Sequence, residues 1–225
     1  MMMSEPLNDA VLDQLFREAR SYNGYLDTQV TQAQLEQIWE LMKFGPTSAN
    51  CLPARIIWCT SEDAKQKLAA CCMPSNGEKI LQAPVTVIIG MDLEFYENLP
   101  ELFPHTDARS WFVGNDALIE KTAFRNSSLQ GAYFMLAARA LGLDTGAMSG
   151  FNNAAVDEAF FAGTKVQSNF ICTLGYGDKA SIFERSPAPH STALTASRDT
   201  KAVASGYADI GYRHCHAGML GCSIR

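Results

Sequence analysis

The sequence predicts an α+β domain in which helices pack around a small central sheet. Two observations support this fold class: residues 84–91 are a nearly uniform apolar run of strand length, and residues 115–141 carry apolar side chains at helical spacing. Helical and strand patterns do not alternate regularly along the chain, which argues against a doubly wound fold. At 225 residues the chain is long enough for one well-formed core and short for two.

The first two predicted helices are marked by their ends. Asn8 can cap the first, and Asn23-Gly24 would end it, because both residues tolerate the left-handed conformation of a C-cap. Thr31 and Gln34 have capping-box spacing for the second helix, which Gly45-Pro46 stops. The residues expected on the apolar faces are Val11, Leu12, Leu15, Phe16 and Ala19, then Leu35, Ile38, Trp39 and Met42.

The middle of the chain contains both strand and helix signals. Residues 54–60 predict a strand, residues 61–72 a short helix, and residues 73–77 a loop. The run at 84–91 predicts a central strand that is covered on both faces. Residues 92–111 are irregular and rich in aromatic side chains, which is more typical of a lid or pocket wall than of a core element.

Three further elements are expected after residue 114. The helix at 115–141 is the longest in the chain, and Gly142 stops it. Residues 144–151 predict a glycine-containing turn, and a helix capped by Asn152 or Asn153 follows and ends near Phe161. Residues 168–176 predict the last strand.

The predicted domain spans residues 1–186, and residues 187–225 are expected to form an atypical, poorly ordered C-terminal tail. The tail is rich in Ser, Thr, Ala and Gly, contains three of the four histidines and sustains no helical or strand period. No metal site is expected, because the spacing of the metal-capable tail residues matches no zinc pattern. These residues are His214, Cys215, His216 and Cys222.

Composition and charge exclude several classes of protein. The net charge is −6 and the 18 Lys and Arg residues are scattered, whereas nucleic-acid binding needs a concentrated basic face. No apolar run reaches the roughly 18 residues that span a membrane, and the first residues lack a secretory signal, so a cytoplasmic location is expected. Seven cysteines without framework spacing predict reduced thiols, and the adjacent Cys71-Cys72 would form only a strained bridge.

The sequence contains no P-loop, no GxGxxG after a strand, no GxSxG elbow and no HExxH. His105 is the only histidine before the tail, so chemistry supplied by a cofactor is favoured.

Three segments suit a phosphorylated planar cofactor. Arg20-Ser21-Tyr22-Asn23 offers a guanidinium and a hydroxyl for a phosphate, and the small polar or glycine-containing runs at 45–53 and 146–151 let backbone amides approach a ring.

Six motifs occur in one order and together give a specific resemblance. They are FGPTSAN at 44–50, SWF at 110–112, FRNSS at 124–128, ALGLDTG at 140–146, MSGF at 148–151 and LGYGD at 174–178. Over about residues 12–185 the chain closely resembles the nitroreductase family. The likeness is to the branch that contains the malonic semialdehyde reductase of pyrimidine catabolism and its NAD(P)H nitroreductase relatives.

This resemblance implies a nitroreductase-like fold and an intertwined homodimer with one FMN in each of two interface clefts. The long helix through Gln130 would supply much of the interface. The residues carried over by position are Arg20, Ser21 and Arg185 for the phosphate, Ser48 and Asn50 along the ribityl chain and flavin, and Ser149 and Gly150 against the ring. Asn23 stands where the wider family often has a second arginine, and the sequence after Arg185 departs from the usual ending of the branch.

The mechanism expected from this resemblance is ping-pong hydride transfer, in which NADH or NADPH reduces the flavin, leaves, and is replaced by a small acceptor. If the acceptor is malonic semialdehyde, reduced to 3-hydroxypropionate, its carboxylate needs a cation and the product alkoxide needs a proton. Arg109 is a candidate for the carboxylate contact, with a surface salt bridge as the alternative, and His105 is a candidate for the proton. Two other functions stay open: a broad NAD(P)H nitroreductase or quinone reductase, and a flavin-binding dimer without turnover.

Overall fold

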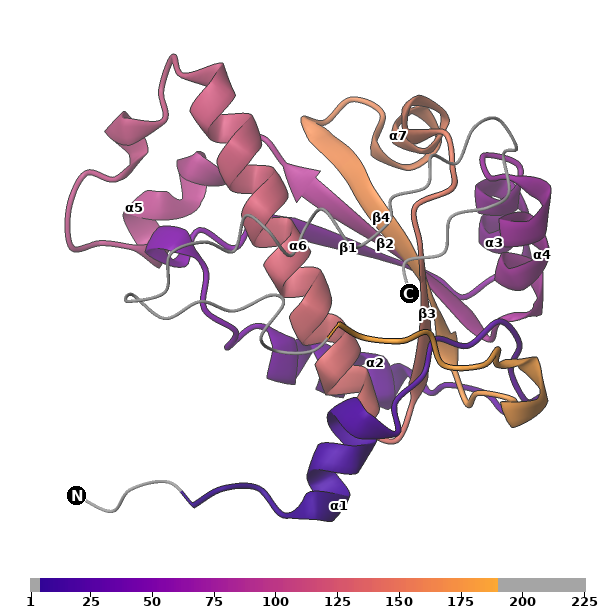
Figure 1. Ribbon diagram of the computed structural model, residues 1–225. Helices are drawn as coiled ribbons and strands as arrows, with labels where there is room; N and C mark the ends of the chain where they lie inside the picture. Colours follow the sequence, from indigo (N-terminus) through magenta and orange to yellow (C-terminus); the bar gives the residue numbers. More distant parts are fainter. Residues whose placement is uncertain (1–4, 190–225) are drawn as a thin grey trace. The chain divides into compact units, whose positions relative to one another are not determined.

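The computed structural model describes residues 5–189 (Figure 1). Within them, the first of two compact units ends at Ile182, and Phe183 begins the second. The predicted tail at 187–225, with its metal-capable residues, lies almost wholly outside the described residues. The fold of the first unit is α+β, as predicted.

A four-stranded antiparallel sheet forms the centre of this unit, with strand order β1-β2-β4-β3. Its strands are β1 (Ala54–Cys59), β2 (Val85–Asp92), β3 (Asp144–Met148) and β4 (Val166–Gly175). Seven of the eight residues of β2 are buried, which confirms the central strand predicted from its apolar run. The two edge strands, β1 and β3, are therefore separated by the two central ones.

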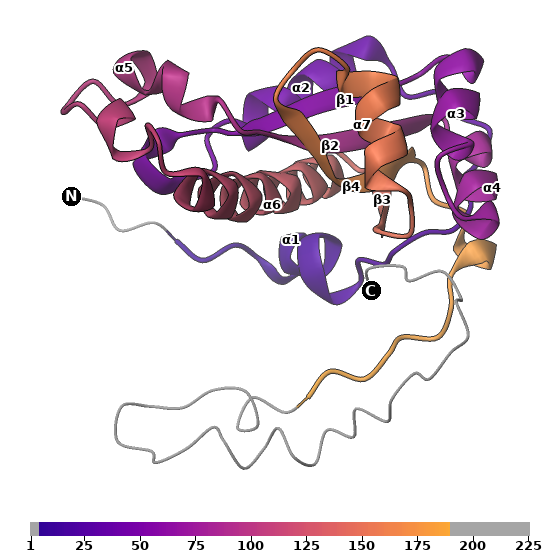
Figure 2. The same cartoon turned by 90° about the horizontal axis from the view of Figure 1, so that it is seen from above.

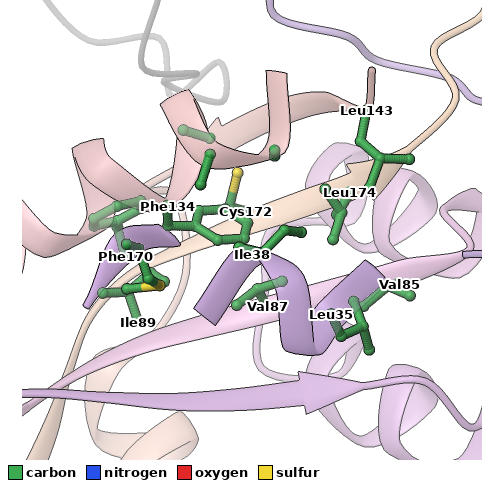
Figure 3. Packing of buried hydrophobic residues seen from close by; sticks show 14 residues of the cluster. Leu35, Ile38, Val85, Val87, Ile89, Phe134, Leu143, Phe170, Cys172 and Leu174 are labelled. Carbon is green, nitrogen blue, oxygen red and sulfur yellow. The ribbon is translucent and has the colours of Figure 1, made fainter. Parts of the chain in front are cut away.

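Two helices, α2 (Gln32–Met42) and α6 (Asp116–Ala140), pack on one face of the sheet. Successive side chains of a strand point to opposite faces, so alternate residues of β2 and β4 meet these helices. Figure 3 shows Phe134 of α6 close to Phe170 and Cys172 of β4. The buried residues of this cluster are Leu35, Ile38, Met42, Val85, Val87, Ile89, Phe134, Ala137, Ala138, Leu143, Ala147, Phe170, Cys172 and Leu174.

Three shorter helices contribute to the core on the opposite face: α3 (Glu62–Ala69), α4 (Pro74–Gln82) and α7 (Asn153–Phe161). The helices α3 and α4 lie side by side in both views (Figure 1, Figure 2). The buried residues of this cluster are Cys59, Leu68, Ile80, Ile88, Met148, Val156, Phe161 and Ile171. Both faces of the central strands are thus covered by helices.

The ends of several helices are as predicted, because they depend on local hydrogen bonds. Asn8 accepts from the amide of Val11 at the start of α1 (Asp9–Leu12). Thr31 and Gln34 form the complete capping box of α2. The long helix predicted at 115–141 is α6, and an asparagine, Asn152, caps α7.

The first helix is shorter than predicted. After α1, one turn of π-helix ends at Arg17, well before Asn23-Gly24. The following backbone is bonded to the edge of the sheet instead, since the amide of Tyr22 donates to the carbonyl of Thr145 at 3.1 Å. Phe16, which was expected on the buried face, is 54% exposed. A tertiary contact with β3 has replaced the local helix.

Three other predictions are wrong. Residues 73–77 are not a loop, because Pro74 stands in the first turn of α4, where its missing amide costs nothing. Residues 144–148 are not a turn but strand β3. Most of its side chains are polar or small, so the sequence shows no apolar strand pattern there. Trp39 is not buried with the rest of its helix face but is 39% exposed.

Residues 92–111, called here the aromatic segment, contain part of a separate core and not only a wall. The segment folds into a 3₁₀ turn (Phe95–Asn98), the short helix α5 (Leu99–Leu102) and a second 3₁₀ turn (Arg109–Trp111). Phe95 meets Phe112 edge to face, with ring centroids 4.9 Å apart. The buried residues of this cluster, called here the second core, are Cys51, Met91, Phe95, Leu99, Ala108, Phe112, Ile119 and Ala123.

Replacing Gly131 of α6 by alanine is predicted to destabilise the protein. In a helix this change normally stabilises by about 0.5–1 kcal/mol. Here a Cβ would lie 2.3 Å from the ring of Phe170, so we expect Gly131→Ala to lower the free energy of unfolding by about 1–3 kcal/mol in urea titration. Gly77→Ala in α4, where the nearest atom is 3.2 Å away, is the matched control and should change stability by less than about 1 kcal/mol. A Gly131→Ala protein more stable than wild type would contradict the packing described.

Candidate functional site

The loop between α2 and β1 contains a strained backbone. Ala49, Asn50 and Leu52 have φ values of 49°, 51° and 38°, and among residues 5–189 they are the only non-glycine residues with positive φ. Such conformations cost about 1–3 kcal/mol each and persist only where the surroundings fix them. This cofactor loop, as residues 45–53 are called from here on, is one of the three segments singled out in the sequence.

One face of α6 fixes the cofactor loop and its exit into β1. The side chains of Asn126, Gln130 and Tyr133 are four and three residues apart, so they project from the same side of the helix. Asn126 Oδ1 accepts from the amide of Ser48 at 2.9 Å, and Gln130 Oε1 accepts from the amide of Ala54 at 2.8 Å. Tyr133 donates its hydroxyl to the carbonyl of Pro46 at 2.9 Å. Three points along the connection are therefore tied to one rigid helix.

The predicted residues Ser48 and Asn50 both lie exposed in this loop. The side-chain amide of Asn50 donates to the carbonyl of Leu102, at the end of α5, at 2.9 Å. Ser48 is bonded through its backbone amide, and its hydroxyl has no hydrogen-bond partner among residues 5–189. The loop can thus offer a hydroxyl, an amide oxygen and backbone groups to a ligand.

A second group of predicted residues follows β3. Ser149 is exposed, and the carbonyl of Gly150 accepts from Asn76 Nδ2 at 3.0 Å. A Cβ on Gly150 would lie 2.7 Å from that same Nδ2, so only glycine fits without displacing Asn76. The turn at 149–150 is therefore held against α4.

Asn76 itself was not predicted from the sequence. It is 1% exposed, and its Oδ1 has no hydrogen-bond partner among the described residues. A buried acceptor without a partner is costly, unless a ligand or water supplies the donor. Lys79 lies one helical turn further along α4, and burial lowers its pKa. Sequence reasoning missed Asn76 because residues 73–77 were expected to be a loop, and it assigned no element to Lys79.

The predicted residues at 20–23 lie beside β3. Ser21 forms a parallel bridge with Thr145, which places Arg20 and Ser21 at the same edge of the sheet as the strand that leads to Ser149. The side-chain amide of Asn23 donates to the carbonyl of Ser181 at 3.0 Å, so Asn23 is engaged within the chain.

Two partly buried polar side chains, Tyr25 and Asp144, are hydrogen-bonded at this edge. The hydroxyls of Tyr25 and Thr173 are 2.7 Å apart, and burial raises the pKa of Tyr25 well above its ordinary value. Asp144 accepts from the amide of Gly177 at 2.9 Å, and burial raises the pKa of its carboxyl despite that bond. Gly146 allows the close approach, since a Cβ there would lie 2.3 Å from the carbonyl oxygen of Tyr22.

Within one chain the predicted residues fall into two separate groups. Met148, at the end of β3, lies opposite Ile171, which lies opposite Ile88, which lies opposite Ile57 of β1. Three strand spacings make about 14 Å between the two edges. The 20–23 and 149–150 residues lie at the β3 edge, whereas the cofactor loop leads into β1. The structure therefore spreads the first group along the β3 edge, with Ser21 opposite Thr145 and Ser149 about 13 Å further along the strand, and places the second group across the sheet from it.

The two speculative catalytic residues lie in the aromatic segment. Arg109 makes a bidentate ion pair with Glu97, with N–O distances of 2.7 and 2.8 Å, and this bonding raises the pKa of the guanidinium and lowers that of the carboxyl. The structure thus shows the surface salt bridge that was the alternative for Arg109. His105 is exposed and meets the ring of Phe103 edge to face at 5.2 Å. Arg185 belongs to the second unit, and its relation to the other residues is not described.

The described cysteines are free thiols, including the adjacent Cys71 and Cys72, as predicted. Among residues 5–189 no cluster of three His, Cys, Asp or Glu side chains could hold a metal ion. In the same range no helix has both the length and the apolar character needed to cross a membrane.

Comparison with known proteins gives a consistent result. The family model described as "Nitroreductase family" matches residues 16–176. A protein of Burkholderia lata, named "Putative NADH dehydrogenase/NAD(P)H nitroreductase", is 61% identical over 181 residues, which cover 80% of this chain and 93% of that protein. A protein of Ralstonia pickettii with the same name and the addition HadB is 60% identical over 176 residues, covering 77% and 90%.

Solved structures of lower identity share the fold. The nitroreductase ydfN of Bacillus subtilis is 21% identical with a TM-score of 0.74, covering 84% of this chain and all of that one. A nitroreductase of Exiguobacterium sibiricum, solved in complex with FMN, is 20% identical with a TM-score of 0.72, covering 83% and 96%. At these identities the likeness shows the fold alone.

Replacing Asn126 by leucine tests whether α6 holds the cofactor loop. The change leaves the amide of Ser48 without its acceptor, and it also removes the bond from Asn126 Nδ2 to the carbonyl of Thr122. We expect Asn126→Leu to lower the free energy of unfolding by about 1–3 kcal/mol in urea titration. Ser128→Ala removes a half-buried hydroxyl of the same helix and should cost less than about 1 kcal/mol. Equal stability of the two variants would show that the loop does not depend on this bond.

Proposed function

Because the chain belongs to the nitroreductase family, and is therefore an FMN-dependent NAD(P)H oxidoreductase, we propose that it reduces malonic semialdehyde to 3-hydroxypropionate. The ordered motifs that this chain has in common with the malonic semialdehyde reductase branch support this acceptor. The proposed setting is pyrimidine catabolism in the cytoplasm. The same family membership favours an enzyme over a flavin-binding dimer without turnover.

The FMN site is supported by two short segments with small side chains, 48–50 and 149–150, whose backbone a ring can approach. These two segments are called here the backbone cradles. A planar ring can lie against backbone only where side chains are small, and a Cβ on Gly150 is excluded by Asn76. The unpartnered Oδ1 of Asn76 is a buried acceptor that a ring N–H could satisfy. The residues present therefore fit FMN.

FMN supplies the centre that accepts a hydride from NAD(P)H and passes it to the acceptor. The chain's own residues bind and orient the reactants. In this proposal Arg20 and Ser21, with Arg185, hold the phosphate, and Ser48 and Asn50 lie along the ribityl chain. Ser149 and Gly150 present backbone to the ring, and α6 and α4 keep both cradles rigid. Asn23 contributes indirectly, since its amide is bonded to Ser181.

We further propose that the enzyme is a homodimer and that each site combines the β3-edge residues of one chain with the cofactor loop of the other. The separation of the two groups within one chain supports this arrangement. An exposed stretch of α6 also supports it, because Phe124 and Leu129 are 55% and 39% exposed there. With Lys121, Arg125 and Ser128 they line an open groove of about 430 Å³. A second chain would cover these apolar side chains.

A broader acceptor range is the second candidate. The curated relatives carry the name NAD(P)H nitroreductase, and an open flavin cleft can admit flat oxidants such as nitroaromatics and quinones. Nothing in the described residues selects between NADH and NADPH. The two candidates differ in which acceptor is turned over with the highest kcat/KM.

Absorption and kinetics test the proposed reaction directly. The purified protein should show a flavin spectrum that bleaches on anaerobic addition of NADPH or NADH. Malonic semialdehyde should then reoxidise it with a kcat/KM at least about ten-fold above that of a nitroaromatic or a quinone. Initial-rate plots at several acceptor concentrations should give parallel lines, as ping-pong turnover requires. Higher kcat/KM for the flat oxidants would favour the second candidate, and a protein that takes up no FMN would refute both.

Mixing two inactive variants tests the composite site. Gly150→Val blocks the β3-edge group and Ser48→Tyr blocks the cofactor loop, so each homodimer should lose FMN. In an equal mixture refolded together, half of the dimers contain both variants and have one intact site, which restores about a quarter of the wild-type FMN content. Each variant refolded alone is the control. No recovery, with dimers present by light scattering, would place all of the residues of a site in one chain.

A further inference from the structure

The cofactor loop and the aromatic segment are joined at three places. At the base, Arg55 donates to the carbonyl of Leu52 at 3.1 Å and forms an ion pair with Asp92. Further along, Asn50 reaches the carbonyl of Leu102. Between these bonds lies the second core. The two segments, about 40 residues apart in sequence, therefore form one connected body.

The second core packs the strained loop directly on the aromatic segment. Cys51 of the loop is 1% exposed, and Phe95 and Leu99 of the segment are fully buried in the same cluster. Ala49 packs against its edge. Such apolar contact resists separation of the two segments, but it is not directional and does not fix their register.

The hydrogen bond from the Asn50 side chain to Leu102 fixes how the aromatic segment is oriented on the loop. Because α5 has four residues, its last carbonyls lack partners within the helix, and Leu102 is the residue that ends it. Asn50 can serve as the donor because it sits at φ 51°, a left-handed conformation that asparagine tolerates better than most residues. The positive φ of Asn50 thus directs its side-chain amide toward the carbonyl of Leu102 in the aromatic segment.

We propose that Asn50 is a positioning residue that fixes the aromatic segment over the cofactor loop and thereby sets the fit of the acceptor. This inference rests on the proposed function, in which Ser48 and Asn50 lie along the ribityl chain, and on the expectation from the sequence that the aromatic segment forms a pocket wall. Asn50 acts through Leu102: its amide holds the end of α5, and the next residue is Phe103, whose ring contacts His105 and Trp111. Removing the bond changes the wall without removing the loop.

Hydrogen exchange tests the link without any cofactor. Asn50→Gly keeps a residue that favours positive φ, and Asn50→Asp keeps the shape but replaces the donor by a carboxylate. In the purified, cofactor-free protein we expect both variants to raise amide exchange of peptides covering residues 99–112 by about two- to ten-fold, as loss of one hydrogen bond implies. Ser48→Ala, in the same loop and without a side-chain bond to the segment, is the control and should leave this exchange unchanged. Unchanged exchange in both Asn50 variants would overturn the proposal.

Kinetics separate positioning from direct contact with the flavin. For Asn50→Gly assayed at saturating FMN we expect the acceptor KM to rise about five-fold, in addition to any rise in the Kd for FMN measured by flavin fluorescence. A large rise in the FMN Kd with unchanged acceptor KM would overturn the proposal and leave Asn50 as a flavin ligand alone. Failure of the wild type to bind FMN would refute the proposed function, whereas the exchange experiment would still decide whether Asn50 holds the segment.

Discussion

The hydrogen bonds from one face of α6 to the connection between α2 and β1 are the constraint on which the rest of the structure depends. A backbone amide that is wholly or partly buried needs an acceptor, and here Gln130 provides it for Ala54 and Asn126 for Ser48. Only with those anchors can three positive-φ conformations, at Ala49, Asn50 and Leu52, be sustained within four residues that are not glycine. The same helix packs Phe134 against the sheet in the main core. The position of the sheet therefore fixes the position of α6, and α6 fixes the loop. Any movement of α6 would be transmitted to the loop.

What the sequence could and could not predict follows the range of the interactions. The caps at Asn8, Thr31 and Asn152 need only neighbours three residues away, and they were predicted correctly. Strand β3 was missed because its residues look like a turn, and it exists only through pairing with β4 and with the backbone at Tyr22. The aromatic segment was expected at the surface, yet its apolar residues form a core with Cys51, a contact that no local pattern reveals.

The candidate site divides in the same way. The small-residue runs at 45–53 and 146–151 were visible as composition, and the family resemblance gave individual residues within them. Asn76 could not be predicted from the sequence, because its hydrogen bond to Gly150 depends on where α4 lies relative to that residue. For Arg109 the sequence left two alternatives, a carboxylate contact and a surface salt bridge. The partner in the salt bridge, Glu97, lies within reach only once the segment folds, and so exposed a pair contributes little to stability.

The buried thiols have a chemical consequence. Burial raises the pKa of Cys51 and Cys59 to about 11 and that of Cys172 to about 12. At neutral pH only about one molecule in ten thousand would carry the thiolate of Cys51, and the thiolate is the form that alkylating agents and peroxides attack. Reduced flavins can pass electrons to oxygen and generate peroxide beside the protein that holds them. Because these three thiols are protonated in the folded chain, they resist oxidation under those conditions, and the rate at which iodoacetamide labels them would report how often the core opens.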